Sequence, residues 1–171
     1  MSYITMNDEK LLPVVIELNT LLADYNMYYQ KLRSYHWNIL GENFFELHEK
    51  FETLYSDARV KIDEIAERIL TLRYHPMSKY SDYLSISSIK ETSPLITDRD
   101  MVKEIIDDHR KLLVQMKLVI SHAENAGDEG TIDLLGGYVR ELEKTSWMLD
   151  AWTKNTKEHL NDSMVENTYD K

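Results

Sequence analysis

The scarcity of residues that interrupt helices constrains this chain more than any other feature, since only five glycines and three prolines occur among its 171 residues. Their positions divide the chain into long uninterrupted stretches. Within each stretch apolar residues recur at spacings of three and four, the pattern of a helix that buries one face. The pattern predicts four long helices, over about residues 10–37, 44–75, 97–127 and 131–160.

Residues 76–94, between the second and third predicted helices, are rich in serine but keep several tyrosines, leucines and isoleucines. This segment is too apolar for a disordered linker and too short for a bundle helix, so it predicts a long connection with one short surface helix. A long connection lets the second and third helices run parallel, as in ferritin-like bundles with one crossover. We therefore expect an all-α, ferritin-like four-helix bundle with one long crossover carrying a short extra helix. It would form a single domain over residues 1–171, with flexible tails at about 1–9 and 161–171.

Composition excludes several classes of function. The chain has no cysteine, which rules out thiolate metal sites and thiol catalysis. Its 30 acidic and 20 basic side chains give a net charge of −10, which opposes binding to phosphate backbones. No apolar stretch approaches the roughly 20 residues of a membrane span, and the first ten residues lack the order of a secretory signal. We expect a cytoplasmic protein that makes no contact with membranes.

Two polar pairs on the second predicted helix are the strongest chemical signal. His48 with Glu52, and Asp63 with Glu67, are each four residues apart and so each stack on one helix face. At about 100° per residue, the four side chains fall within roughly 100° of one another, on an outer face about 130° from the core stripe. That face also carries Tyr55, and its partly apolar character suggests a contact between subunits.

The two pairs are too far apart to form one site in one chain. His48 and Asp63 are separated by 15 residues, or about 22 Å at the rise of an α-helix. Two copies of the helix crossing antiparallel near Asp57 would place the first pair of one chain beside the second pair of the other. Such a two-fold contact gives two identical sites per dimer. The alternative for Asp63 and Glu67 is an ordinary solvated surface.

His36 ends the first predicted helix, and the turn through Gly41 returns the chain toward His48, so His36 is a candidate third ligand. Histidine and carboxylate ligands without thiolate suit iron, manganese or zinc, and open positions on such a metal suit redox chemistry. A ferritin-type site within one bundle would need Glu-x-x-His on two helices, and no histidine here follows a glutamate by three. His109 lies on the apolar stripe of the third helix and is predicted to be a hydrogen-bonded core residue.

The segment His-Trp-Asn-Ile-Leu-Gly-Glu-Asn-Phe at residues 36–44, followed by His48, Glu52, Asp63 and Glu67, resembles the Dps mini-ferritins (DNA-binding proteins from starved cells). The resemblance extends over nearly the whole chain. It implies a hollow shell of twelve subunits that oxidises ferrous iron, preferentially with hydrogen peroxide rather than oxygen, and stores the ferric mineral. It also implies a protective role against oxidative damage.

The resemblance also implies roles for individual residues. Ferroxidase sites with two irons each would lie at two-fold interfaces. They would be built from His36, His48 and Glu52 of one subunit and Asp63 and Glu67 of its partner, with Trp37 packing beside the metals. Asp128 and Asp133, at the start of the fourth helix, resemble the acids that line the family's iron-entry pores, although acids are favoured at a helix N-terminus in any case.

Two other classes of function stay open at this point. One is a nucleoid-binding structural protein with secondary iron chemistry, but twelve copies would carry roughly −120, which predicts little or no affinity for DNA. The other is a helical interaction module in which Asp63 and Glu67 are merely solvated. It predicts a monomer or dimer and no effect of Asp63→Ala on iron oxidation.

Overall fold

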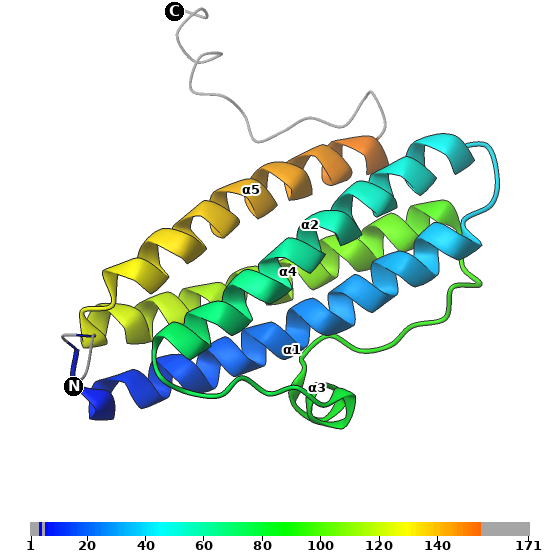
Figure 1. Cartoon of the computed structure of the whole chain (residues 1–171). Helices are drawn as coiled ribbons and strands as arrows, with labels where there is room; N and C mark the ends of the chain where they lie inside the picture. The colour runs from blue at the N-terminus through cyan, green and yellow to red at the C-terminus, as the bar shows by residue number, and fades with distance from the viewer. Residues whose placement is uncertain (1–3, 5, 155–171) are drawn as a thin grey trace, which may run out of the picture.

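The structure is a computed structural model that describes residue 4 and residues 6–154, and within these it contains five helices and no strand. Four long helices lie side by side along one axis: α1 (Asp8–Asn38), α2 (Phe44–Thr71), α4 (Asp98–Ala126) and α5 (Glu129–Thr153). The short helix α3 (Tyr80–Ile86) belongs to the crossover, which runs the length of the bundle and makes α2 and α4 parallel (Figure 1). The predicted all-α bundle with one helix-bearing crossover is confirmed.

Local signals explain most of the helix ends. The Asn7 side chain accepts a hydrogen bond from the Glu9 amide and caps α1, so the helix begins at Asp8, inside the segment expected to be a tail. Thr97 caps α4 by accepting a hydrogen bond from the Asp100 amide, and Gly127 ends α4 with a left-handed φ of 69°. The tail expected over 161–171 and the last residues of the fourth predicted helix lie outside the described residues.

Two predicted boundaries were wrong. Helix α2 ends at Thr71, four residues before His75, because Arg73 adopts a left-handed φ of 71° and no glycine marks the position. Helix α5 begins at Glu129 rather than near residue 131, because the Asp128 side chain caps it by accepting a hydrogen bond from the Thr131 amide.

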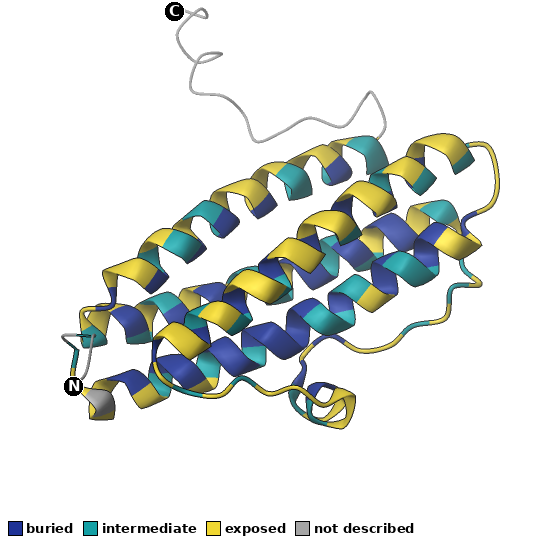
Figure 2. Cartoon of the chain, in the orientation of Figure 1, coloured by how far each residue is buried: buried dark blue, intermediate teal, exposed yellow. Residues whose placement is uncertain are grey.

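The core is one continuous cluster centred on α1, whose inner face is buried along its whole length (Figure 2). Burying a large side chain such as the fully enclosed Phe51 contributes roughly 1.5–3 kcal/mol. The residues that α1 contributes to this cluster follow the predicted spacing: Leu11, Val14, Leu18, Leu21, Leu22, Tyr25, Tyr28, Leu32 and Tyr35.

A buried carboxylate attaches the crossover to the bundle. Asp24 of α1 is fully buried and accepts hydrogen bonds from the Ser87 hydroxyl at 2.8 Å and from the Ser88 amide at 2.7 Å. These bonds satisfy a charge that would otherwise be costly to bury. They hold the segment after α3 against α1. None of the helices in the described part of the chain combines the length and apolar character that a bilayer crossing requires.

Candidate metal centre

Three of the predicted ligands gather where α1 ends and α2 begins. His36 lies in the last turn of α1, and His48 and Glu52 lie in the second and third turns of α2. One potential ligand atom from each of the three lies within 4.8 Å of the others. Gly41 makes the return possible, since its φ of 106° is one that other residues rarely adopt.

The two histidines are held by a reciprocal pair of hydrogen bonds. His36 Nδ1 bonds to the carbonyl oxygen of His48 at 2.8 Å, and His48 Nδ1 bonds to the carbonyl oxygen of His36 at 2.9 Å. Since a carbonyl can only accept, each Nδ1 carries the proton, and Nε2 of each neutral ring keeps a free lone pair. The rings stack with their centroids 3.7 Å apart. Backbone carbonyls commonly fix metal-binding histidines in this way.

Aromatic rings enclose the histidine pair on both sides. Phe44, the last residue of the family-like segment, stacks on His48 with centroids 5.1 Å apart. Tyr55 meets His36 edge-on at 5.3 Å. The Tyr55 hydroxyl is hydrogen-bonded to the candidate ligand Glu52, and burial, followed by the charge of Glu52 and this hydrogen bond, raises the pKa of Tyr55. Sequence reasoning gave Tyr55 no role at the centre, although its position three residues after Glu52 places it on the same face.

Trp37 does not lie within the cluster. Its ring is 58% exposed, and the Arg33 guanidinium sits over it, 4.7 Å from the ring centroid. Arg33 also lies over Tyr29, whose ring meets that of Tyr55. Within one chain Trp37 therefore stands at the outer end of an aromatic row that begins at the histidines.

Asp63 and Glu67 lie further along the same helix and are exposed. Neither carboxylate has an ion-pair or hydrogen-bond partner among the described residues. The helix between the two pairs is continuous, so the separation of about 22 Å expected from the helical rise holds. The chain thus holds His36, His48 and Glu52 together in one group. Asp63 and Glu67 lie elsewhere on α2, with no polar partner among the described residues.

The two acids at the start of α5 differ sharply. Asp128 is fully buried: it forms an ion pair with Arg68 and accepts hydrogen bonds from the amide and, at 2.5 Å, the hydroxyl of Thr131. Both carboxylate oxygens of Asp128 already have partners inside the fold, and its role as a pore ligand stays a prediction. Asp133 is exposed and borders a hollow of about 350 Å³ together with Glu67.

The prediction that His109 is a hydrogen-bonded core histidine is confirmed. It is fully buried, with Nε2 2.7 Å from the Tyr28 hydroxyl and Nδ1 2.8 Å from the Ser146 hydroxyl. Burial, with the charges of Lys50 and Lys61, lowers the pKa of His109 to about 3. Both ring nitrogens are engaged, so this histidine has no lone pair to offer a metal.

The bundle, its single crossover and a histidine–carboxylate cluster without thiolates define a ferritin-like protein. The comparisons agree, since residues 16–158 match the ferritin-like domain family. A Dps protein from Vibrio cholerae O1, described as a member of a broad superfamily of ferritin-like diiron-carboxylate proteins, has a similar solved structure. Its TM-score is 0.86 at 44% identity, covering 90% of this chain and 98% of the other.

Similar proteins of known name place the chain in one branch of the ferritin-like proteins. DNA protection during starvation protein 2 from Bacillus anthracis is 45% identical over 139 residues, which cover 81% of this chain and 95% of the relative. DNA protection during starvation protein from Porphyromonas gingivalis is 40% identical over 147 residues, or 86% and 92% of the two chains. The chain belongs to the Dps family of ferritin-like proteins.

Proposed function

We propose that this protein oxidises ferrous iron at sites shared between two copies of the chain and stores the ferric product. The observation that carries the proposal is the split ligand set on α2. His36, His48 and Glu52 offer two free imidazole nitrogens and a carboxylate in one place. Asp63 and Glu67 supply the remaining carboxylates only if a second copy brings them there.

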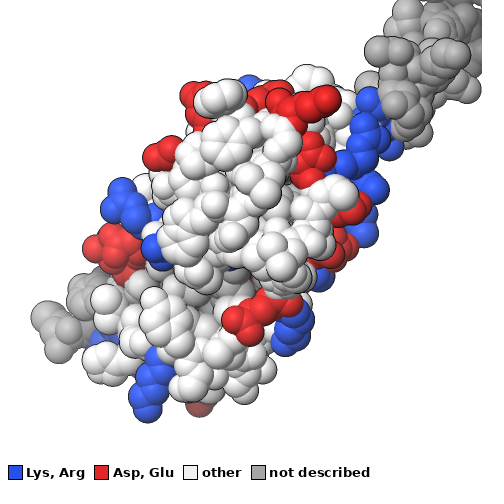
Figure 3. Space-filling view, turned by 90° about the vertical axis from the view of Figure 1, so that its right-hand side faces the viewer, with Lys and Arg blue, Asp and Glu red and all other residues white. Residues whose placement is uncertain are grey.

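The surface supports association of copies. At the end of the bundle where α1 meets α2, Leu40 and Phe45 are 80% and 85% exposed. Figure 3 shows this end as a broad uncharged surface with acidic and basic side chains around it. Exposed apolar patches mark contact surfaces, and Leu40 and Phe45 contribute two large apolar side chains to this end of the bundle. Membership of the Dps family supports a homo-oligomeric shell, and we propose twelve subunits with the oxidation sites at two-fold interfaces.

Iron is the substrate in this proposal. Histidine and carboxylate ligands suit Fe(II), and two irons held in one site supply together the two electrons that reduce one hydrogen peroxide to water. Pairing the electrons avoids release of hydroxyl radical, which supports peroxide over oxygen as the working oxidant. Removing both reactants from the cytoplasm would protect the cell against oxidative damage, in keeping with the starvation-protection names of the relatives.

The charge balance of the chain opposes direct DNA binding. The chain carries a net charge of −10, and a shell of such chains would repel the phosphate backbone. We propose that any protection of DNA is chemical rather than by contact. Nanomolar retention on duplex DNA at physiological salt would contradict this part of the proposal.

A subunit-mixing experiment tests the shared site. His48→Ala and Asp63→Ala are prepared separately and also co-assembled in equal amounts, and oxidation of anaerobically loaded Fe(II) by hydrogen peroxide is followed by ferric absorbance. Each variant alone is expected to lose the fast phase. In a random mixture about a quarter of the sites combine His48 of one chain with Asp63 of the other, so about a quarter of the fast phase returns.

The controls separate a shared site from a general effect of charge. Glu124→Gln removes an exposed acid of α4 that belongs to neither ligand pair and is expected to oxidise iron at the wild-type rate. Wild-type protein is expected to consume two irons per peroxide. No recovery on mixing, or wild-type rates in Asp63→Ala alone, would refute the shared site.

A further inference from the structure

A second cavity, separate from the metal centre, lies between α2 and α5. Its volume is about 360 Å³, and its floor includes Leu54 and Leu142. We call it the α2–α5 cleft and define it by the polar residues that line it: Tyr25, Lys50, Asp57, Lys61, Glu141 and Lys144. The iron chemistry proposed above uses none of these side chains.

Basic side chains outnumber acidic ones in the cleft, whereas acidic side chains outnumber basic ones in the whole chain. Three lysines face two acids there, although acids outnumber bases by ten in the full sequence. Lys61 forms ion pairs with both acids: its Nζ lies 2.6 Å from a carboxylate oxygen of Asp57 and 3.0 Å from one of Glu141. Lys50 and Lys144 have no ion-pair partner among the described residues. Two uncompensated positive charges therefore line one cleft.

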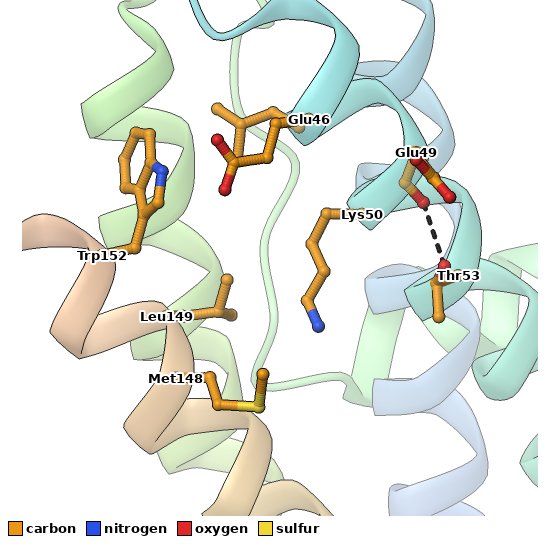
Figure 4. A pocket seen from close by; sticks show the side chains of 8 residues that line it. Glu46, Glu49, Lys50, Thr53, Met148, Leu149 and Trp152 are labelled. Carbon is orange, nitrogen blue, oxygen red and sulfur yellow. Dashed lines mark hydrogen bonds between the residues drawn. The ribbon is translucent and has the colours of Figure 1, made fainter.

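Lys50 points along the cleft rather than toward nearby acids. Figure 4 shows the adjoining pocket, which shares Lys50 and Met148 with the cleft: the Lys50 side chain extends from α2 toward Met148 of α5, and the carboxylate of Glu46 turns toward Trp152. Glu46 is one helical turn away and does not form an ion pair with it. The charge of Lys50 contributes to the lowered pKa of the buried His109, so the ammonium group acts on the interior of the bundle.

The floor of the cleft holds an unsatisfied hydrogen-bond donor. Tyr25 is 1% exposed, and its hydroxyl has no hydrogen-bond partner in the structure. Buried polar atoms nearly always have a partner, and Tyr25 lines the cleft, so its hydroxyl is a candidate donor to a species bound there. Burial, with the charges of Asp57 and Glu141, raises the pKa of Tyr25 well above its ordinary value, so the phenol keeps its proton and can donate it.

We propose that the α2–α5 cleft binds inorganic phosphate between Lys50 and Lys144, with the Tyr25 hydroxyl as a third donor. Lysine ammonium groups are common phosphate ligands because they act as compact point charges. The neighbouring carboxylates of Asp57 and Glu141 select the ligand further. Hydrogen phosphate carries an O–H that can donate to a carboxylate, whereas sulfate has only acceptor oxygens and would be repelled.

Phosphate binding is measured on the metal-free assembled protein, by calorimetry and by phosphorus NMR. We expect saturable binding of one phosphate per subunit, with sulfate at least tenfold weaker. Lys50→Gln combined with Lys144→Gln is expected to weaken binding at least tenfold. Tyr25→Phe, which keeps the ring and removes one donor, is expected to weaken it about fivefold. The matched control is Lys103→Gln, which removes an exposed lysine paired with Asp100 on α4.

Three outcomes would overturn the proposal: no saturable binding by wild type, equal affinity in the double lysine variant, or sulfate binding as tightly as phosphate. Circular dichroism and size-exclusion chromatography establish that each variant folds and assembles. If Tyr25→Phe fails to fold, the lysine variants decide the matter alone. Because no iron is present, failure here leaves the shared oxidation site untouched, and failure of the iron experiment leaves phosphate binding untouched.

Discussion

The histidines of this chain occupy two environments that use the same ring in opposite ways. At the junction of α1 and α2, His36 and His48 each give one nitrogen to a backbone carbonyl and keep the other free. In the core, His109 gives both nitrogens to protein hydroxyls. A metal site therefore depends on which lone pairs the fold leaves unused as well as on residue type.

The carboxylates repeat the contrast. Asp128 has both oxygens engaged by Arg68 and Thr131, whereas Asp63, Glu67 and Asp133 are exposed. A buried, fully bonded carboxylate stabilises the fold by keeping its partners. An exposed one is available to a cation or to another subunit.

The largest expected effect follows from removing the core histidine. His109→Ala deletes a fully buried ring and leaves the hydroxyls of Tyr28 and Ser146 without their shared partner. We expect the free energy of unfolding, measured by denaturant titration at fixed subunit concentration, to fall by about 3 kcal/mol. Iron oxidation per folded subunit should stay within about twofold of wild type. A loss of oxidation beyond the loss of folded protein would contradict the structural role.

The next effect comes from a substitution at the metal centre that preserves shape. His36→Phe keeps an aromatic ring able to stack on His48 and removes the free nitrogen. Fe(II) oxidation is expected to slow about 100-fold, equivalent to about 2.7 kcal/mol of barrier. The free energy of unfolding should fall by about 1 kcal/mol, the value of the hydrogen bond that His36 makes. Wild-type oxidation in this variant would show that His36 is packing alone.

Sequence reasoning predicts these environments unevenly. The spacing of His48, Glu52, Asp63 and Glu67 on one helix follows from the helical period, and so does the buried stripe of α1. The reciprocal bonds between His36 and His48 cross a turn whose path no periodicity specifies. Sequence patterns do not predict the ion pair of Asp128 with Arg68 either, since the two residues lie 60 positions apart in the chain.

The same limit explains why the sequence alone leaves the role of Asp128 open. An acid directly before a helix is equally compatible with a cap, a pore lining or a solvated surface. The position of α2 beside α5 decides the role of Asp128, because it brings the Arg68 guanidinium within reach of the carboxylate. Gly130 permits that approach, because a side-chain carbon there would lie 2.9 Å from the guanidinium. Contacts between residues far apart in the chain are the part of the site that local patterns do not contain.

A third prediction compares the two acids of α5. Asp128→Asn keeps a good capping side chain but leaves Arg68, which is only partly exposed, without its charge partner. We expect the free energy of unfolding to fall by about 2 kcal/mol. Asp133→Asn should change it by less than about 0.5 kcal/mol, because the side chain is exposed. Equal destabilisation by the two substitutions would remove the distinction between a bonded and a free carboxylate.

The smallest expected effect is a pH dependence specific to His109. Its pKa is about 3 in the folded chain and near 6.5 when unfolded, so between these values only the unfolded state binds the proton. Stability contributed by this group is therefore complete above pH 6.5 and falls as the pH decreases toward 3. Between pH 7 and 5.5 the loss is about 1 kcal/mol, measured by denaturant titration at both values.

His109→Gln is the control for this dependence, because glutamine keeps polar atoms in the site and cannot titrate. The difference in unfolding free energy between wild type and His109→Gln should shrink by about 1 kcal/mol from pH 7 to pH 5.5. The other histidines are the same in both proteins, so their contributions cancel in the difference. A difference that stays constant would mean that His109 takes up a proton in the folded state. Its two hydrogen bonds to protein hydroxyls would then not keep the ring of His109 neutral.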